Sequence, residues 1–229
     1  RMQVDALAHY DAALRLAPFD TAIRQERSVV EAAVRGQRPP AQDARSTGLY
    51  AFLRWEYAHA LSVWETYETQ RDPQAELDAL VSAALGIMYL FGESPARAYP
   101  RLRDACRELP NVGFLTTYHA EAALRCGDVV LAETLLAAAA EMPMLDPGGA
   151  LERVRAGLRA AQGRDAEAEA LYRALPWNAV AAAEYGDFLR SRGRVEEALL
   201  HCRSAFQSAT GLWTGRRLIT VAEEWGASL

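Results

Sequence analysis

Apolar side chains follow one another along most of this chain at helical spacing, and alternating β-branched runs typical of half-buried strands are absent. Spacings of three and four residues place apolar side chains on one face of a helix. The pattern therefore predicts an all-α fold. We expect about thirteen helices, near 2–17, 19–35, 41–54, 57–71, 74–91, 94–108, 111–126, 128–141, 147–162, 164–175, 177–192, 194–209 and 212–225.

Small residues recur in pairs 12 positions apart, and each pair is followed by a larger side chain. The sets are Gly48 and Ala60 with Trp64, Gly86 and Ala98 with Leu102, Ala120 and Ala132 with Leu136, Ala156 and Ala168 with Tyr172, and Gly186 and Ala198 with Cys202. Successive sets lie 38, 34, 36 and 30 residues apart, a period that indicates stacked supersecondary units. Antiparallel helices approach closely only where small residues face each other, and the larger residue fills the space beside them.

Turn residues stand at the expected places between these helices. Gly127, Gly163 and Gly193 each lie five residues before a second-helix alanine, and we expect them to end the first helix in the left-handed conformation. Prolines are expected to end the second helices, since proline cannot continue a helix. These prolines are Pro18, Pro73, Pro110, Pro143 and Pro176.

With these residues in place, the chain resembles the tetratricopeptide repeat (TPR) family. Two half-repeats match its ladder of small, large, small residue and proline: Ala6, Tyr10, Ala13, Pro18 and Ala98, Leu102, Ala105, Pro110. The repeats are degenerate, with Tyr67 and Leu175 where a third small residue is expected. The resemblance implies an alpha-alpha superhelix, a TPR-like solenoid of antiparallel helix pairs.

The resemblance also implies one array over 1–229. It would comprise an opening helix pair in 1–40, about five degenerate repeats in 41–211 and a capping helix in 212–229. The chain opens on a second-helix signature without a first-helix partner. We therefore expect it to continue a longer protein at this end, with self-association through the open end as the alternative.

In proteins that resemble this family, first helices line a concave groove for an extended peptide or partner helix. Transferring that geometry predicts the groove residues Arg45, Leu49, Phe52, Ile87, Thr117, Glu121, Leu124, Arg125, Arg153, Asp187 and Arg190. The alternative for the apolar members is core between repeats. Charged members are expected to be solvated, so charge reversal at Glu121 or Arg190 should leave the melting temperature unchanged. The Lys and Asn arrangement of chaperone-binding members is absent.

The charge of the chain limits the classes of partner that it can bind. The chain has a formal net charge of −5, its basic residues are all arginine, and no basic block occurs. A nucleic-acid partner is therefore not expected, because phosphates require a basic face. No run of about 20 apolar residues is present, so no membrane insertion is expected. No signal peptide is visible, which favours a cytoplasmic location.

Candidate catalytic residues do not form known constellations. His9, His59, His119 and His201 lie apart, and Cys106, Cys126 and Cys202 contain no Cys-x-x-Cys. We expect each histidine to be either packed between helices or solvated, and Cys202 to be a small buried apolar residue. We predict no catalytic residue, no metal and no cofactor.

The sequence therefore predicts a non-enzymatic scaffold that binds a peptide or partner protein in the groove. Two alternatives stay open. One is an all-helical enzyme or nucleic-acid-acting protein on the same solenoid, and the other is the interaction segment of a larger transcriptional regulator. A deep pocket with two convergent carboxylates or a histidine pair would favour the enzyme, and an open trough would favour the scaffold.

Overall fold

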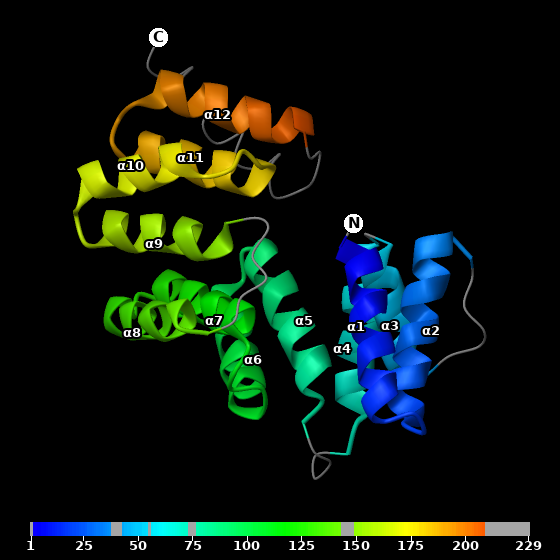
Figure 1. The fold of residues 1–229 in the computed structure, drawn as a ribbon. Coiled ribbons are helices and arrows are strands. Elements are labelled where there is room, and N and C mark those ends of the chain that lie inside the picture. Colours follow the sequence, from blue (N-terminus) through cyan, green and yellow to red (C-terminus); the bar gives the residue numbers. More distant parts are fainter. Residues whose placement is uncertain (1, 38–42, 55, 73–76, 143–148, 209–229) are drawn as a thin grey trace. The chain divides into compact units, whose positions relative to one another are not determined.

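The computed structural model describes residues 2–37, 43–54, 56–72, 77–142 and 149–208. Within these residues every regular element is an α-helix, and the twelve helices form pairs (Figure 1). The pairs are α1 (Met2–Leu16) with α2 (Thr21–Arg35), α3 (Ala44–Leu53) with α4 (Tyr57–Gln70), α5 (Ala79–Phe91) with α6 (Pro95–Glu108), α7 (Gly113–Arg125) with α8 (Val129–Ala140), α9 (Ala150–Ala161) with α10 (Asp165–Ala174), and α11 (Ala179–Ser191) with α12 (Val195–Ser208). The all-α prediction is confirmed. The helix expected near 212–225 lies outside the described residues.

The chain divides into two compact units, Arg1–Glu76 and Leu77–Leu229. The first unit contains α1 to α4, and the second contains α5 to α12. Within each unit, consecutive helices pack against one another, and in the second unit the first helices α7 and α9 also contact each other across repeats. Helix pairs therefore stack within each unit as the repeat pattern predicts.

Local sequence explains where many helices begin. Several start at an Asp or Asn whose side-chain oxygen accepts a hydrogen bond from a backbone N–H of the first turn, which satisfies one of the free donors there. These residues are Asp20, Asp43, Asp78, Asp128 and Asn178.

The small-residue pattern marks the close approaches between paired helices. Each second-helix alanine of the pattern is completely buried: Ala60, Ala98, Ala132, Ala168 and Ala198. At the glycines, an added Cβ would collide with the larger residue that the pattern assigns to the same set. It would lie 2.3 Å from Trp64 Nε1 at Gly48, 2.5 Å from Leu102 Cγ at Gly86, and 2.5 Å from Cys202 Sγ at Gly186. The predicted register is confirmed, and Cys202 is buried as expected.

The turns also follow the prediction. Gly127, Gly163 and Gly193 have φ values of 89°, 73° and 76°, the left-handed conformation that ends the first helix of each pair. Three helices end just before the prolines that the sequence singled out: α1 before Pro18, α6 before Pro110 and α10 before Pro176. Pro73 and Pro143 lie outside the described residues.

His119 on α7 is packed in the protein interior. It is 7% exposed, its ring centroid lies 5.4 Å from that of Tyr99, and neither ring nitrogen has a hydrogen-bond partner among the described residues. Burial lowers the pKa of His119, and the charge of Arg103 lowers it further. The interpretation of this residue as a histidine packed between helices is confirmed.

We expect His119 to make the second unit sensitive to acid. The folded-state pKa lies below the ordinary value of 6.5, so the unfolded chain binds the proton first. Stability is retained above about 6.5 and is lost as the pH falls through it, by at most about 1.4 kcal/mol per pH unit. In urea titrations at several pH values, His119→Phe should flatten this dependence. Parallel curves for His119→Phe and wild type would contradict the prediction.

Candidate functional site

Three successive first helices of the second unit, α7, α9 and α11, contribute to one hollow of about 530 Å³. Its walls carry charged side chains from each of these helices together with apolar side chains. Six of the residues predicted for the groove line it: Glu121, Leu124, Arg125, Arg153, Asp187 and Arg190. The structure therefore brings together predicted residues that are far apart in the sequence.

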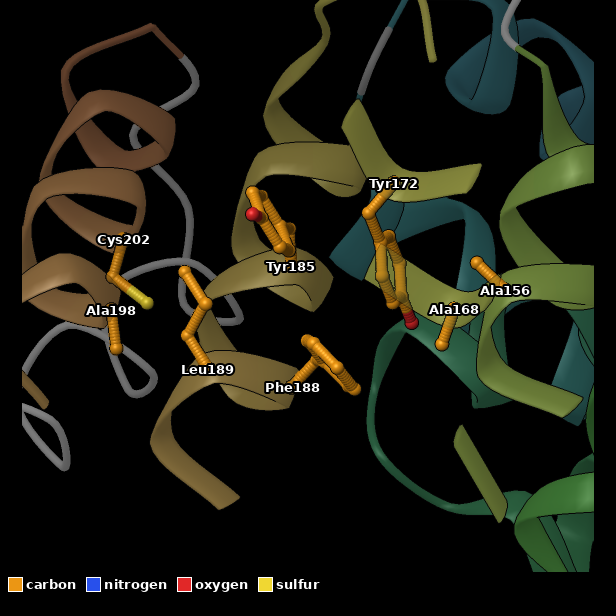
Figure 2. Packing of buried hydrophobic residues seen from close by; sticks show 8 residues of the cluster. All are labelled: Ala156, Ala168, Tyr172, Tyr185, Phe188, Leu189, Ala198 and Cys202. Carbon is orange, nitrogen blue, oxygen red and sulfur yellow. The ribbon is translucent and has the colours of Figure 1, made fainter. Parts of the chain in front are cut away.

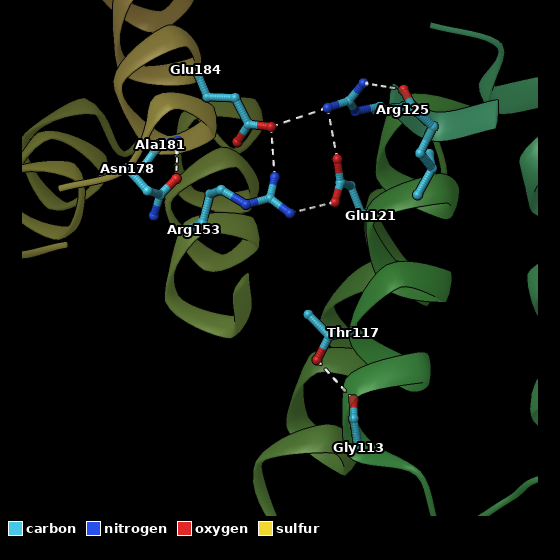
Figure 3. Close-up of polar contacts among 9 residues, drawn as sticks. Gly113, Thr117, Glu121, Arg125, Arg153, Asn178, Ala181 and Glu184 are labelled. Atoms are coloured by element: carbon cyan, nitrogen blue, oxygen red, sulfur yellow. Dashed lines mark hydrogen bonds and ion pairs between the residues drawn. The ribbon is translucent and has the colours of Figure 1, made fainter. Parts of the chain in front are cut away.

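The other five predicted residues do not line this hollow. Ile87 lies on α5 and Thr117 on α7, whereas Arg45, Leu49 and Phe52 lie on α3 in the first unit. Thr117 is completely buried, and its hydroxyl donates to the Gly113 carbonyl oxygen at 2.9 Å (Figure 3).

The residues on α3 take part in packing within the first unit. Leu49 is 8% exposed and belongs to the core. The ring of Phe52 lies 5.9 Å from that of Trp64, centroid to centroid. Arg45 forms an ion pair with Glu26 at 2.6 Å. For Leu49, burial therefore favours the alternative interpretation as core.

An ion-pair network crosses the three helices at the hollow (Figure 3). The guanidinium group of Arg153 on α9 donates to Glu121 on α7 at 2.7 Å and to Glu184 on α11 at 2.6 Å. Arg125 on α7 is 2.6 Å from the second oxygen of Glu121 and donates to Glu184 at 3.0 Å. It also donates to the Leu90 carbonyl oxygen at 3.3 Å. We call Glu121, Arg125, Arg153 and Glu184 the charge quartet.

The quartet is largely buried. The side chains of Arg153 and Glu121 are 3% and 4% exposed, and those of Glu184 and Arg125 are 12% and 22% exposed. Burial by itself would lower the pKa of Arg153, but the charges of Glu121 and Glu184 outweigh it and hold the pKa well above its ordinary value. The prediction that Glu121 is solvated is wrong, because Arg153 and Arg125 compensate its charge and allow burial.

Sequence reasoning missed Glu184 and Tyr172, which also line the hollow. Glu184 lies three residues before Asp187, so helical spacing places both on the same face of α11. That spacing was the available signal. Tyr172 was assigned only to the space beside Ala168, and no sequence signal indicates that it also reaches the hollow.

A second hollow of about 590 Å³ lies among α8, α9 and α10. Leu136 and Leu158 form buried parts of its wall, and charged residues stand around them. Arg159 bridges Glu133 at 3.3 Å and Glu167 at 3.7 Å. Two of the three helices that form this hollow, α8 and α10, are second helices of their repeats. Its residues provide matched control positions for the first hollow.

Among the described residues, no group of three or more His, Cys, Asp or Glu side chains is placed to hold a metal ion. In the same part of the chain, no helix is both long enough and apolar enough to cross a membrane.

The comparisons with known proteins bear on the fold. Neither a protein-family model nor a curated protein matches the chain. Solved structures do match. One is a thermophilic TPR protein from Thermus thermophilus, with a TM-score of 0.56 and 20% identity over 79% of this chain and 98% of that chain. Another is a tetratricopeptide repeat protein from Parabacteroides merdae, with a TM-score of 0.56 and 17% identity over 96% of this chain and 92% of that chain. The fold is a TPR-like helical repeat.

A third similar structure is the APC/C hetero-tetramer Cut9-Hcn1. Its TM-score is 0.58 at 13% identity, and the match covers 98% of this chain and 47% of that chain. The alpha-alpha superhelix predicted from the sequence is thus the fold shared with these structures. In TPR-like terms, α5, α7, α9 and α11 are the first helices of their repeats, and the hollow lies against three of them.

Proposed function

We propose that this chain is a non-enzymatic protein-interaction scaffold that binds a peptide or a partner protein in the hollow of α7, α9 and α11. The observation that carries the proposal is the convergence of six residues from three repeats on one hollow of about 530 Å³. Its lining includes both charged and apolar side chains, so it offers ionic contacts and apolar area to a partner.

The enzyme alternative has one specific observation in its favour. Two carboxylates, Glu121 and Glu184, converge on the same hollow. Both, however, already accept hydrogen bonds from guanidinium groups of Arg153 and Arg125. A general acid or base needs an oxygen that is free to reach the substrate. Both oxygens of Glu121 face a guanidinium group, whereas both guanidinium contacts of Glu184 fall on its Oε1 atom. The pairing therefore favours a structural role for Glu121, and the enzyme alternative rests on Oε2 of Glu184 alone.

The comparisons add a weaker argument for protein binding. Cut9-Hcn1 is a hetero-tetramer, so a chain of this fold takes part in a protein assembly there. The identity to that structure is 13%, which transfers the fold and no partner. The partner class proposed here rests on the hollow itself.

The experiment selects peptides from a random display library on the wild-type chain and measures their affinity for variants. We expect the double variant Asp187→Asn with Arg190→Gln to bind about tenfold more weakly, because both side chains line the hollow and the change removes their charges but preserves their size. Its free energy of unfolding should fall by less than about 1 kcal/mol, because both positions are half-buried and the amides keep the side-chain size while losing contacts within the protein.

The matched control is Glu133→Gln with Arg159→Gln, which removes an ion pair of the same kind from the second hollow. It should leave peptide affinity unchanged. If the control weakens binding and the α11 variant does not, the partner binds the second hollow. If no peptide is enriched above an unrelated helical protein, peptide binding by this chain is refuted.

A further inference from the structure

Tyr172 on α10 places an unpartnered hydroxyl at the hollow. Its ring packs among the buried side chains of α9, α10 and α11, with centroid distances of 5.4 Å to Tyr185 and 5.6 Å to Phe188 (Figure 2). The residue is 8% exposed, and it lines the hollow. Its hydroxyl makes no hydrogen bond to another residue that the structure describes, and its oxygen is not among the fully buried ones, so it stays accessible from the hollow.

The neighbouring tyrosine of the same cluster shows the contrast. The hydroxyl of Tyr185 donates to Glu169 at 3.1 Å and accepts from Arg173 Nε at 3.2 Å. The Tyr172 hydroxyl makes no such bond, and a phenylalanine would fill the space of the Tyr172 ring equally well. Packing alone therefore does not explain the hydroxyl of Tyr172.

Gly157 opens the space in front of this hydroxyl. It lies in the interior of α9, where glycine is less favourable than alanine. An added Cβ would lie 3.4 Å from Leu124 Cδ2 and 3.8 Å from Tyr172 Oη, which are ordinary contacts. Packing thus requires glycine at Gly86 and Gly186, where a Cβ would collide at 2.5 Å, and does not require it here. The missing side chain leaves Tyr172 Oη uncovered and lets another backbone approach.

The surroundings of the hydroxyl favour a neutral ligand group. Burial raises the pKa of Tyr172 well above its ordinary range, and Glu184 raises it further, so the hydroxyl keeps its proton and can donate it to a hydrogen bond. The charges that act on it are the two carboxylates and two guanidinium groups of the charge quartet. Because these four charges compensate one another, the quartet adds no net charge at the hydroxyl.

We propose that Tyr172 and Gly157 form a subsite of the hollow that recognises the main chain of an extended peptide. Tyr172 Oη donates a hydrogen bond to one backbone carbonyl oxygen of the peptide, and Gly157 admits the peptide backbone to that distance. The subsite rests on the proposed function, because it requires a peptide in the hollow. It makes Tyr172, a second-helix residue, a determinant of where the peptide lies.

The test uses two small changes and a peptide selected on the wild-type chain. Tyr172→Phe removes only the hydroxyl, and Gly157→Ala adds only the covering methyl group. Each should weaken peptide binding about fivefold to tenfold, the worth of one hydrogen bond. Neither should lower the melting temperature, and Gly157→Ala should raise it because alanine is the better helix former. The matched control, Tyr185→Phe, should lower the melting temperature and leave affinity unchanged, because its hydroxyl is already bonded within the protein.

A second measurement identifies the peptide group. Replacing single amides of the peptide by esters weakens the preceding carbonyl as an acceptor. One position should lose affinity for the wild type and lose none for Tyr172→Phe. If Tyr172→Phe lowers the melting temperature as Tyr185→Phe does, or if no ester position depends on Tyr172, the subsite is refuted.

The outcomes separate the two proposals. If Tyr172→Phe and Gly157→Ala bind as wild type while Asp187→Asn with Arg190→Gln binds weakly, the hollow binds the peptide without this subsite. If all four changes leave affinity unchanged, the proposed function fails together with the subsite.

Discussion

Replacing Arg153 by methionine is expected to lower the free energy of unfolding of the second unit by about 3–5 kcal/mol. The change keeps much of the side-chain volume and removes the charge that Glu121 and Glu184 share. Glu121 would then remain buried beside Arg125 but without the charge of Arg153. Urea unfolding followed by far-ultraviolet circular dichroism measures the loss.

Two further variants test whether the loss of stability comes from buried carboxylates that have lost the charge of Arg153. In the triple variant Glu121→Gln, Arg153→Met and Glu184→Gln, no carboxylate is left buried, so much of the loss should be recovered. Arg155→Met breaks an ion pair with Glu152 whose side chains are 34% and 44% exposed, and it should cost less than about 1 kcal/mol. If Arg153→Met costs no more than Arg155→Met, the quartet does not hold the three helices together.

Ala132→Arg is expected to destabilise the second unit by more than about 3 kcal/mol. Ala132 is completely buried in a cluster that includes Ala120 and Leu136. An arginine would overpack the crossing of α7 and α8 and bury a charge without a partner. A lower melting temperature, with partial loss of helical signal, is the result to measure.

Ala138→Arg on the same helix is the matched control, because Ala138 is exposed and arginine is also a good helix former. It should melt within a few degrees of wild type, which corresponds to about 0.5 kcal/mol or less. Equal melting of the two variants would show that the small-residue register is wrong.

Much of the fold could be predicted from the sequence because its determinants are local. Helix ends follow from caps, glycines and prolines that act within one turn. The close approaches of paired helices join residues 16 apart, such as Gly48 and Trp64, inside a single hairpin. A pattern of small and large residues at that separation is sufficient to predict which faces pack.

The groove could be predicted only in part. Helical spacing placed Thr117 and Glu121 on one face of α7. It could not predict that Thr117 is completely buried while Glu121 lines the hollow. Burial of each position depends on how the next repeat packs over it. That packing involves residues about 30 positions away, and no local pattern encodes it.

By itself, then, the sequence determined the helices, their pairing and the faces that pack, because short-range periodicity dictates these. The tertiary structure alone decided the ion pairs of the charge quartet and the position of Tyr172 at the hollow. Arg153 contacts residues 32 positions before it and 31 after it, so its pairing exists only once three repeats are stacked. Tyr172 lines the hollow beside Gly157 of the neighbouring helix, a contact that exists only once α9 and α10 are packed.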